Sequence, residues 1–186
     1  MPRTSNKREK LLEAATELIH QQGFKHTTLA DIAEKSEVPL GNVYYYFKTK
    51  DDIASAVIDE RNSELAKMAE KWEQLYSDPR QRLIAFLDLL DSSCDEVAHK
   101  GCPIGSLCQE LNKDAGSLSE FASSTLKFLI NWTEKQFTQI GISDSHGAAI
   151  EHISSLQGLA LLANSLNDPA LMSDQINRLR KKLNEL

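Results

Sequence analysis

Apolar residues recur every three or four positions along nearly the whole chain, which is the spacing of one face of an α-helix. No stretch shows the alternation of apolar and polar residues that a half-buried strand would show. The pattern therefore predicts an all-α protein of about nine helices. The first predicted helix ends at Gly23, and the others cover about 29–36, 40–46, 50–76, 79–98, 103–112, 117–140, a segment that ends at 166, and 169–186.

Several of these helices begin at residues that can satisfy the free backbone N–H groups of a first turn. Thr28 precedes Asp31 by three residues, which is the spacing of a capping box. The Asp-Pro pairs at 78–79 and 168–169 each place a capping carboxylate before a proline at the first helical position. These signals predict three helix starts.

The last two predicted helices are apolar over more of their surface than a helix at the surface of a monomer can be. Residues 153–166 read ISSLQGLALLANSL, with apolar side chains around much of the helix. The following segment repeats apolar residues in steps of four and three, at Met172, Ile176, Leu179, Leu183 and Leu186. That spacing favours packing along another helix. We expect a homodimer with a four-helix interface built from the last two helices, and burial of both inside one bundle is the alternative.

The composition is that of an ordinary globular protein. The 186 residues are 41% hydrophobic and 26% charged, and no apolar run approaches the roughly 18 residues of a membrane span. Residues 1–20 carry acidic side chains where a secretory signal would be uniformly apolar, so we expect a cytoplasmic protein with no membrane partner. The three cysteines are an odd number and are expected to be thiols.

The charge is unevenly distributed. Residues 1–50 carry eight basic and six acidic side chains, whereas the other 136 residues carry 13 basic and 21 acidic ones. A comparatively basic end in an acidic chain is a weak indication of polyanion binding. Function is therefore sought first in the N-terminal segment.

Residues 27–50, TTLADIAEKSEVPLGNVYYYFKTK, contain two short predicted helices joined by a tight turn. This is the arrangement of a helix-turn-helix, whose second helix enters the major groove of DNA. The apolar positions that would pack these helices against the first helix of the chain are Leu29, Ile32, Ala33, Val38, Val43 and Phe47. The positions that face away, toward DNA, are Leu40, Gly41, Asn42, Tyr44, Tyr45 and Tyr46, flanked by Lys48 and Lys50.

The string LADIAEKSEVPLGNVYYYFKTKDDI, with a long helix predicted directly behind it, resembles the TetR/AcrR family of bacterial transcription regulators. The resemblance implies a three-helix DNA-binding domain over residues 1–48 and a larger helical domain for effector binding and dimerisation over 49–186. It further implies a ligand-responsive repressor that binds an inverted repeat in double-stranded DNA as a homodimer. A small hydrophobic or electrophilic effector would release it.

The resemblance also implies roles for residues of the motif. Thr27 and Thr28 would present a hydroxyl and helix N-terminal amides to a phosphate. Base edges or thymine methyl groups would be met by Leu40, Gly41, Asn42 and Tyr44. The DNA backbone would be held by Tyr45, Tyr46, Lys48 and Lys50. Alternatives remain open, because Tyr46 could equally pack in the core and both lysines could simply be solvated.

In a regulator of this layout, the effector binds among the helices of the C-terminal domain. Three predicted helices carry apolar stripes that would point inward together. The predicted lining is Phe86, Leu90, Cys94, Cys102, Leu107, Cys108, Phe121, Thr125, Phe128 and Trp132. An ordinary filled core is the alternative for each residue. A ligand that favours one packing of this interior would move the helix 50–76 and with it the DNA-reading helices.

Cys102 is the most distinctive position outside the motif. Pro103 suits the first position of a helix, which leaves Cys102 at the cap with its sulfur near free backbone amides. Helix N-termini lower thiol pKa values, and Lys100 adds positive charge nearby. Cys102 could thus be a reactive thiol in a redox-sensing regulator, or an inert cysteine in a tight turn. A metal site built from Cys94, His99 and Cys102 would have unusual spacing, so no metal or cofactor is expected.

An enzyme and a helical carrier of a hydrophobic ligand are the competing classes of function. The chain has no metal-binding helix signature, no phosphate-binding glycine loop and no nucleophile elbow, and its five histidines are scattered. A carrier would leave the outward tyrosines and the two flanking lysines without a purpose. The sequence therefore favours a DNA-binding regulator.

Overall fold

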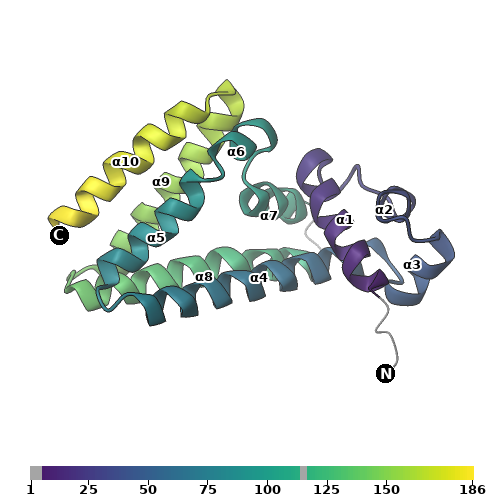
Figure 1. The fold of residues 1–186 in the computed structure, drawn as a ribbon, viewed down its shortest axis with the longest axis horizontal. Coiled ribbons are helices and arrows are strands. Elements are labelled where there is room, and N and C mark those ends of the chain that lie inside the picture. The colour runs from purple at the N-terminus through teal and green to yellow at the C-terminus, as the bar shows by residue number, and fades with distance from the viewer. Residues whose placement is uncertain (1–5, 114–116) are drawn as a thin grey trace. The chain divides into compact units, whose positions relative to one another are not determined.

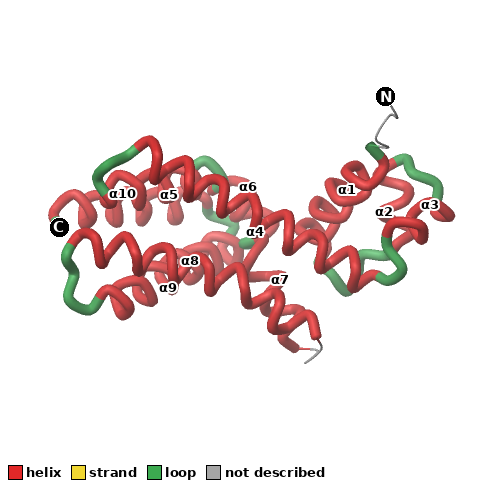
Figure 2. The backbone as a smooth tube through the Cα atoms, turned by 90° about the horizontal axis from the view of Figure 1, so that it is seen from below, coloured by secondary structure: helices red, strands yellow, loops and turns green. Residues whose placement is uncertain are grey.

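The computed structural model describes residues 6–113 and 117–186, and every regular element in these ranges is an α-helix (Figures 1 and 2). The all-α prediction is confirmed. The ten helices are α1 Lys7–Gln22, α2 Leu29–Ser36, α3 Leu40–Tyr46, α4 Lys50–Leu75, α5 Pro79–Asp91, α6 Cys94–Lys100, α7 Pro103–Lys113, α8 Ser117–Ile140, α9 Ser145–Leu166 and α10 Pro169–Glu185.

The single helix predicted over 79–98 is wrong, because two serines divide it into α5 and α6. The hydroxyls of Ser92 and Ser93 both donate to the Leu89 carbonyl, at 2.7 and 2.9 Å. Serine hydroxyls compete in this way for carbonyls that would otherwise continue the helix. The apolar stripe is unbroken in the sequence, so the periodicity gave no sign of the division.

The predicted helix starts at Thr28, Asp78 and Asp168 are confirmed. The hydroxyl of Thr28 accepts the Asp31 N–H at 3.2 Å, and the Asp31 carboxylate accepts the Thr28 N–H at 2.8 Å. Asp78 accepts the N–H of Arg80, and Asp168 accepts that of Leu171. Such caps each contribute about 1 kcal/mol to helix stability.

The chain divides into two compact units. The first consists of Met1–Arg61 and Ser106–Ser124, and the second of Asn62–Gly105 and Thr125–Leu186. Three helices, α4, α7 and α8, contribute residues to both units. The functional boundary between residues 48 and 49 stays a prediction.

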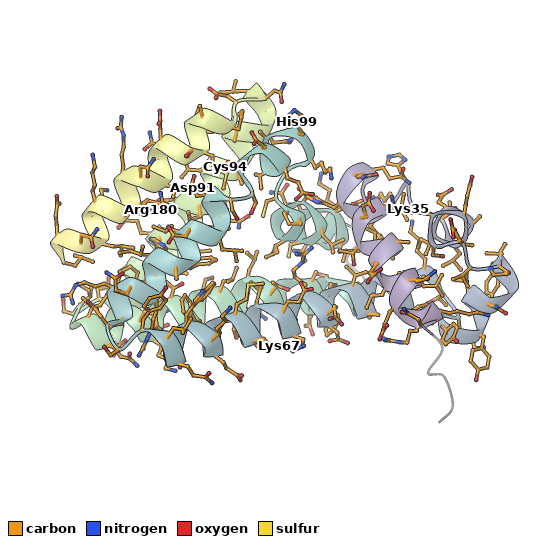
Figure 3. The ribbon with its side chains drawn as sticks, viewed as in Figure 1. Lys35, Lys67, Asp91, Cys94, His99 and Arg180 are labelled. Atoms are coloured by element: carbon orange, nitrogen blue, oxygen red, sulfur yellow. The ribbon has the colours of Figure 1, made fainter. Side chains whose placement is uncertain are left out.

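The second unit is built around one apolar cluster. Phe86 and Trp132 belong to it, the half-buried Trp72 packs against it, and the three ring centroids lie 5.5–6.0 Å apart. Helix α10 packs on α5, α6 and α9 and buries Met172 and Ile176. The outer edge of this packing is polar, where Arg180 of α10 forms salt bridges of 2.7 and 2.8 Å with Asp88 and Asp91 of α5 (Figure 3).

Among the helices described, none combines the length and the apolar character that crossing a bilayer requires.

His152 is an unusual member of the second unit, because it is buried without a hydrogen-bond partner for Nε2 among the described residues. Its ring packs edge-on against Phe137, with centroids 5.9 Å apart. Burial lowers the pKa of His152 to about 4, from an ordinary value of 6.5. Between these two values the unfolded chain binds the proton and the folded chain does not. Folding stability should therefore fall as the pH drops through this range.

Replacing His152 by leucine should remove this pH dependence. Between pH 7.5 and pH 5.0, the wild type should lose about 2 kcal/mol more of its free energy of unfolding than His152→Leu loses. Urea unfolding at both pH values and one protein concentration measures the difference. Equal losses in the two proteins would show that His152 does not stay neutral when the chain is folded.

Candidate nucleic-acid interface

Helices α2 and α3 form a helix-turn-helix whose inner face is apolar. The turn between them uses Glu37 in the left-handed region, with φ 57°, and the Val38 N–H donates to the Ala33 carbonyl at 3.1 Å. Five of the six predicted packing positions are buried, namely Ile32, Ala33, Val38, Val43 and Phe47, and Leu29 is half-buried. The two helices thus have a defined outer face.

The outer face of α3 exposes large side chains. Tyr45 is 76% exposed, Tyr44 48% and Leu40 41%. A Cβ atom on Gly41 would meet nothing within 4 Å, so the backbone there is open to a close approach. We call Leu40, Gly41, Tyr44 and Tyr45 the α3 surface. These exposed side chains do not contribute to the core of the first unit.

Two other predicted contact residues lie at the margin of this surface and are half-buried. They are Asn42 and Tyr46. The Tyr46 ring packs edge-on against Tyr45 at a centroid distance of 5.1 Å, which supports the orientation of the more exposed ring.

Lys48 lies at the C-terminal end of α3 and is exposed. Its ammonium donates to the Tyr44 carbonyl at 2.8 Å, where the negative end of the helix dipole favours a cation. The backbone N–H groups of Lys48 and Thr49 both donate to the Asp52 carboxylate, at 2.9 and 3.0 Å. The turn from α3 into α4 is therefore held by hydrogen bonds, and Lys48 remains at the surface.

The structure places the two threonines differently from the prediction. Thr27 is fully buried, and its hydroxyl donates to the Gly23 carbonyl at 2.8 Å, so it cannot present this group to a phosphate. Thr28 is exposed, but Asp31 binds both its N–H and its hydroxyl. Hydrogen bonds from the Thr28 backbone and side chain lower the pKa of Asp31, so a negative charge already occupies the start of α2.

Lys50 also departs from the prediction. Its ammonium donates to the Lys25 carbonyl at 3.0 Å and lies 4.3 Å from the centroid of the Phe24 ring. The side chain is thus bound to the turn between α1 and α2. In this conformation the ammonium contacts the turn before α2 and is not simply solvated.

This geometry agrees with the results of comparison with known proteins. The family of bacterial regulatory proteins described as "tetR family" matches residues 11–57. The HTH-type transcriptional regulator LmrA of Bacillus subtilis is 31% identical over 141 residues, which is 74% of each chain. The chain belongs to the TetR family. Its members are transcriptional regulators and not enzymes, so this protein is a DNA-binding regulator.

Two further comparisons extend over almost the whole chain. An HTH-type regulator from the lacX 3′ region of Lactococcus lactis is 27% identical and covers 94% of this chain and 92% of its own. The crystal structure of a TetR regulator from Legionella pneumophila has a TM-score of 0.83, at 19% identity, over 97% of this chain and 98% of its own. The fold beyond the DNA-binding motif is therefore that of the family.

The predicted effector residues divide between the two units of this TetR-family chain. Six of them share the apolar cluster of the second unit, namely Phe86, Leu90, Cys94, Cys102, Phe128 and Trp132. Thr125, also in that unit, is buried, and its hydroxyl donates to Asn62 Oδ1 at 2.6 Å. The other three belong to the first unit, namely Leu107, Cys108 and Phe121.

Asn62 is a candidate effector-binding residue that the sequence reading missed. It lies four residues after Ile58 and three before Leu65, so it falls on the apolar stripe of α4. A polar residue within such a stripe was the available signal. Its hydrogen bond with Thr125 places two polar side chains in the unit that holds most of the predicted effector residues, and a mostly apolar ligand needs a few such polar contacts.

The cysteines differ in environment as well as in burial. The Gly105 N–H donates to the Cys102 sulfur at 3.3 Å, which confirms the predicted position of the thiol at the start of α7. Lys100 pairs with Glu96 at 3.0 Å. Burial, together with the charge of Asp91, raises the pKa of Cys94 to about 11. Among the described residues, no three His, Cys, Asp or Glu side chains gather to hold a metal ion.

Iodoacetamide at pH 8 should therefore alkylate Cys102 more than about tenfold faster than Cys94. Cys102 is half-exposed, whereas Cys94 is buried and remains a thiol at that pH. Peptide mass spectrometry measures both rates, and unfolding the protein in urea should bring them together. Equal rates in the folded protein would contradict the assigned environments.

Proposed function

We propose that the protein is an effector-responsive repressor that binds an inverted-repeat operator as a homodimer. The observation that carries the proposal is the α3 surface. A helix buried on one side by Val43 holds Leu40, Tyr44 and Tyr45 in solvent on the other, where the major groove would meet them. Asn42 and Lys48 border this surface and would supply a base contact and a phosphate contact.

The proposed dimer rests on apolar residues that the chain leaves uncovered. On α9, Leu161 is 60% exposed, Leu166 62% and Leu162 49%. A groove of about 430 Å³ between α9 and α10, lined in part by Leu162, lies beside them. Most of the apolar repeat of α10 packs within its own chain, since Met172, Ile176 and Leu183 are buried there. The interface is therefore proposed to centre on α9, with α10 at its edge.

The proposed effector site lies in the apolar cluster of the second unit, around Phe86, Phe128 and Trp132. The hydrogen bond between Asn62 and Thr125 adds a polar contact point. Trp72 and Trp132 are the two tryptophans of the chain, and their rings lie 5.5 Å apart. Quenching of their fluorescence would report binding during a compound screen. The factor by which bound effector lowers affinity for the operator must equal the factor by which bound operator lowers affinity for the effector.

Selection of bound duplexes from a random pool should yield an inverted repeat. Two substitutions should then separate the base contact from the phosphate contact. Asn42→Ala should lower affinity for the selected operator without changing affinity for random duplex. Lys48→Met should weaken binding to both and reduce the slope of log affinity against log salt by about 2 per dimer. Fluorescence anisotropy over a salt series measures these quantities. Salt-independent binding by the wild type would contradict the proposed mode of binding.

Substitution Leu161→Asp should convert the dimer to a monomer, because a carboxylate would have to lose its hydration inside an apolar interface. Light scattering coupled to size exclusion should show the mass falling from that of two chains to that of one, with operator binding weakened by more than about tenfold. Leu75→Asp on α4 is a matched control, since Leu75 is 61% exposed. A wild type that is already monomeric would refute the dimer.

A further inference from the structure

The turn between α1 and α2 is bound by a side chain 85 residues further along the chain. Glu110 of α7 accepts the Phe24 N–H at 2.7 Å through Oε2 and the Lys25 N–H at 2.6 Å through Oε1. All three residues belong to the first unit. A carboxylate that receives two backbone N–H groups forms charge-assisted bonds, which are shorter and stronger than neutral ones.

Lys50, the first residue of α4, contacts the same turn. Its ammonium donates to the Lys25 carbonyl at 3.0 Å and lies over the buried Phe24 ring. Burial lowers the pKa of Lys50, and the negative charge of Glu110 acts in the opposite direction. The backbone of Lys25 is thus held at its N–H by α7 and at its carbonyl by the first residue of α4.

The turn has little freedom to relax around these contacts. Gly23 has φ 84°, and a Cβ atom there would lie 3.1 Å from Glu110 Oε2, so the carboxylate sits close against the backbone. The Thr27 hydroxyl closes the turn on the Gly23 carbonyl, and the capping box of α2 begins at Thr28. The direction in which α2 leaves the turn, and with it the placement of α3, therefore depends on residues 23–27.

We infer that Glu110 and Lys50 are positioning residues for operator binding. They hold the turn before α2 so that the α3 surface has the placement that a half-site requires. The inference rests on the proposed function, because two recognition helices must match half-sites about one helical turn apart. A hydrogen bond weakens steeply as its donor and acceptor move apart. A small movement of α7 at Glu110 would therefore break the two hydrogen bonds that hold the turn.

The test compares Glu110→Ala, Glu110→Gln and Lys50→Met with Gln109→Ala, an exposed neighbour on the same helix. Glu110→Ala should lower affinity for the selected operator by about tenfold, while affinity for random duplex changes less than about twofold. The Phe24 and Lys25 amides should exchange with deuterium faster. The salt slope should be unchanged in Glu110→Ala and Lys50→Met, because neither side chain is placed on a phosphate. Gln109→Ala should match the wild type throughout.

A double-mutant cycle completes the experiment. Glu110→Ala and Lys50→Met hold one turn, so their effects on operator affinity should be less than additive. Unchanged operator affinity in Glu110→Ala, with normal binding by the wild type, would overturn the inference, as would a lower salt slope in Lys50→Met. If Glu110→Ala does not fold by circular dichroism, Glu110→Gln decides, because it keeps the shape and loses the charge. A wild type without operator preference would instead refute the proposed function.

Discussion

The structure depends on the burial of one face of α3. A helix of seven residues is too short to be stable alone, because it forms too few backbone hydrogen bonds to offset the free-energy cost of nucleation. It exists here because Val43 and Phe47 are buried in the first unit. That burial also fixes the rotation of the helix, so Tyr44 and Tyr45 have no position available except solvent.

The supports of α3 are polar as well as apolar. The capping box of Thr28 and Asp31 begins α2, Asp52 binds the turn that leads into α4, and Glu110 binds the turn that leads into α2. Apolar packing supplies most of the free energy of folding but has little directional preference. Hydrogen bonds to backbone groups constrain direction, which is what a surface that must match DNA needs.

Local signals predicted the features that depend on neighbouring residues. The capping box and both Asp-Pro starts are visible as residue types at fixed offsets, and the structure contains each of them. The predictions failed where two local preferences compete. Ser92 and Ser93 ended α5 although the apolar stripe continued, since their hydroxyls took the carbonyl of Leu89. Thr27 is a second example. A threonine next to a helix start was predicted to face a phosphate, whereas its buried hydroxyl donates to the Gly23 carbonyl.

The sequence by itself determined the helical class, the helix-turn-helix and the outward face of α3, because the spacing of apolar residues along each helix records which face will be buried. Only the tertiary structure decided that Lys50 binds the Lys25 carbonyl and that Glu110 binds the Phe24 and Lys25 N–H groups. It also decided that most of the α10 repeat packs within its own chain while leucines of α9 stay exposed. Partners 25 or 85 residues apart leave no periodic trace, since they meet only when separate helices pack together.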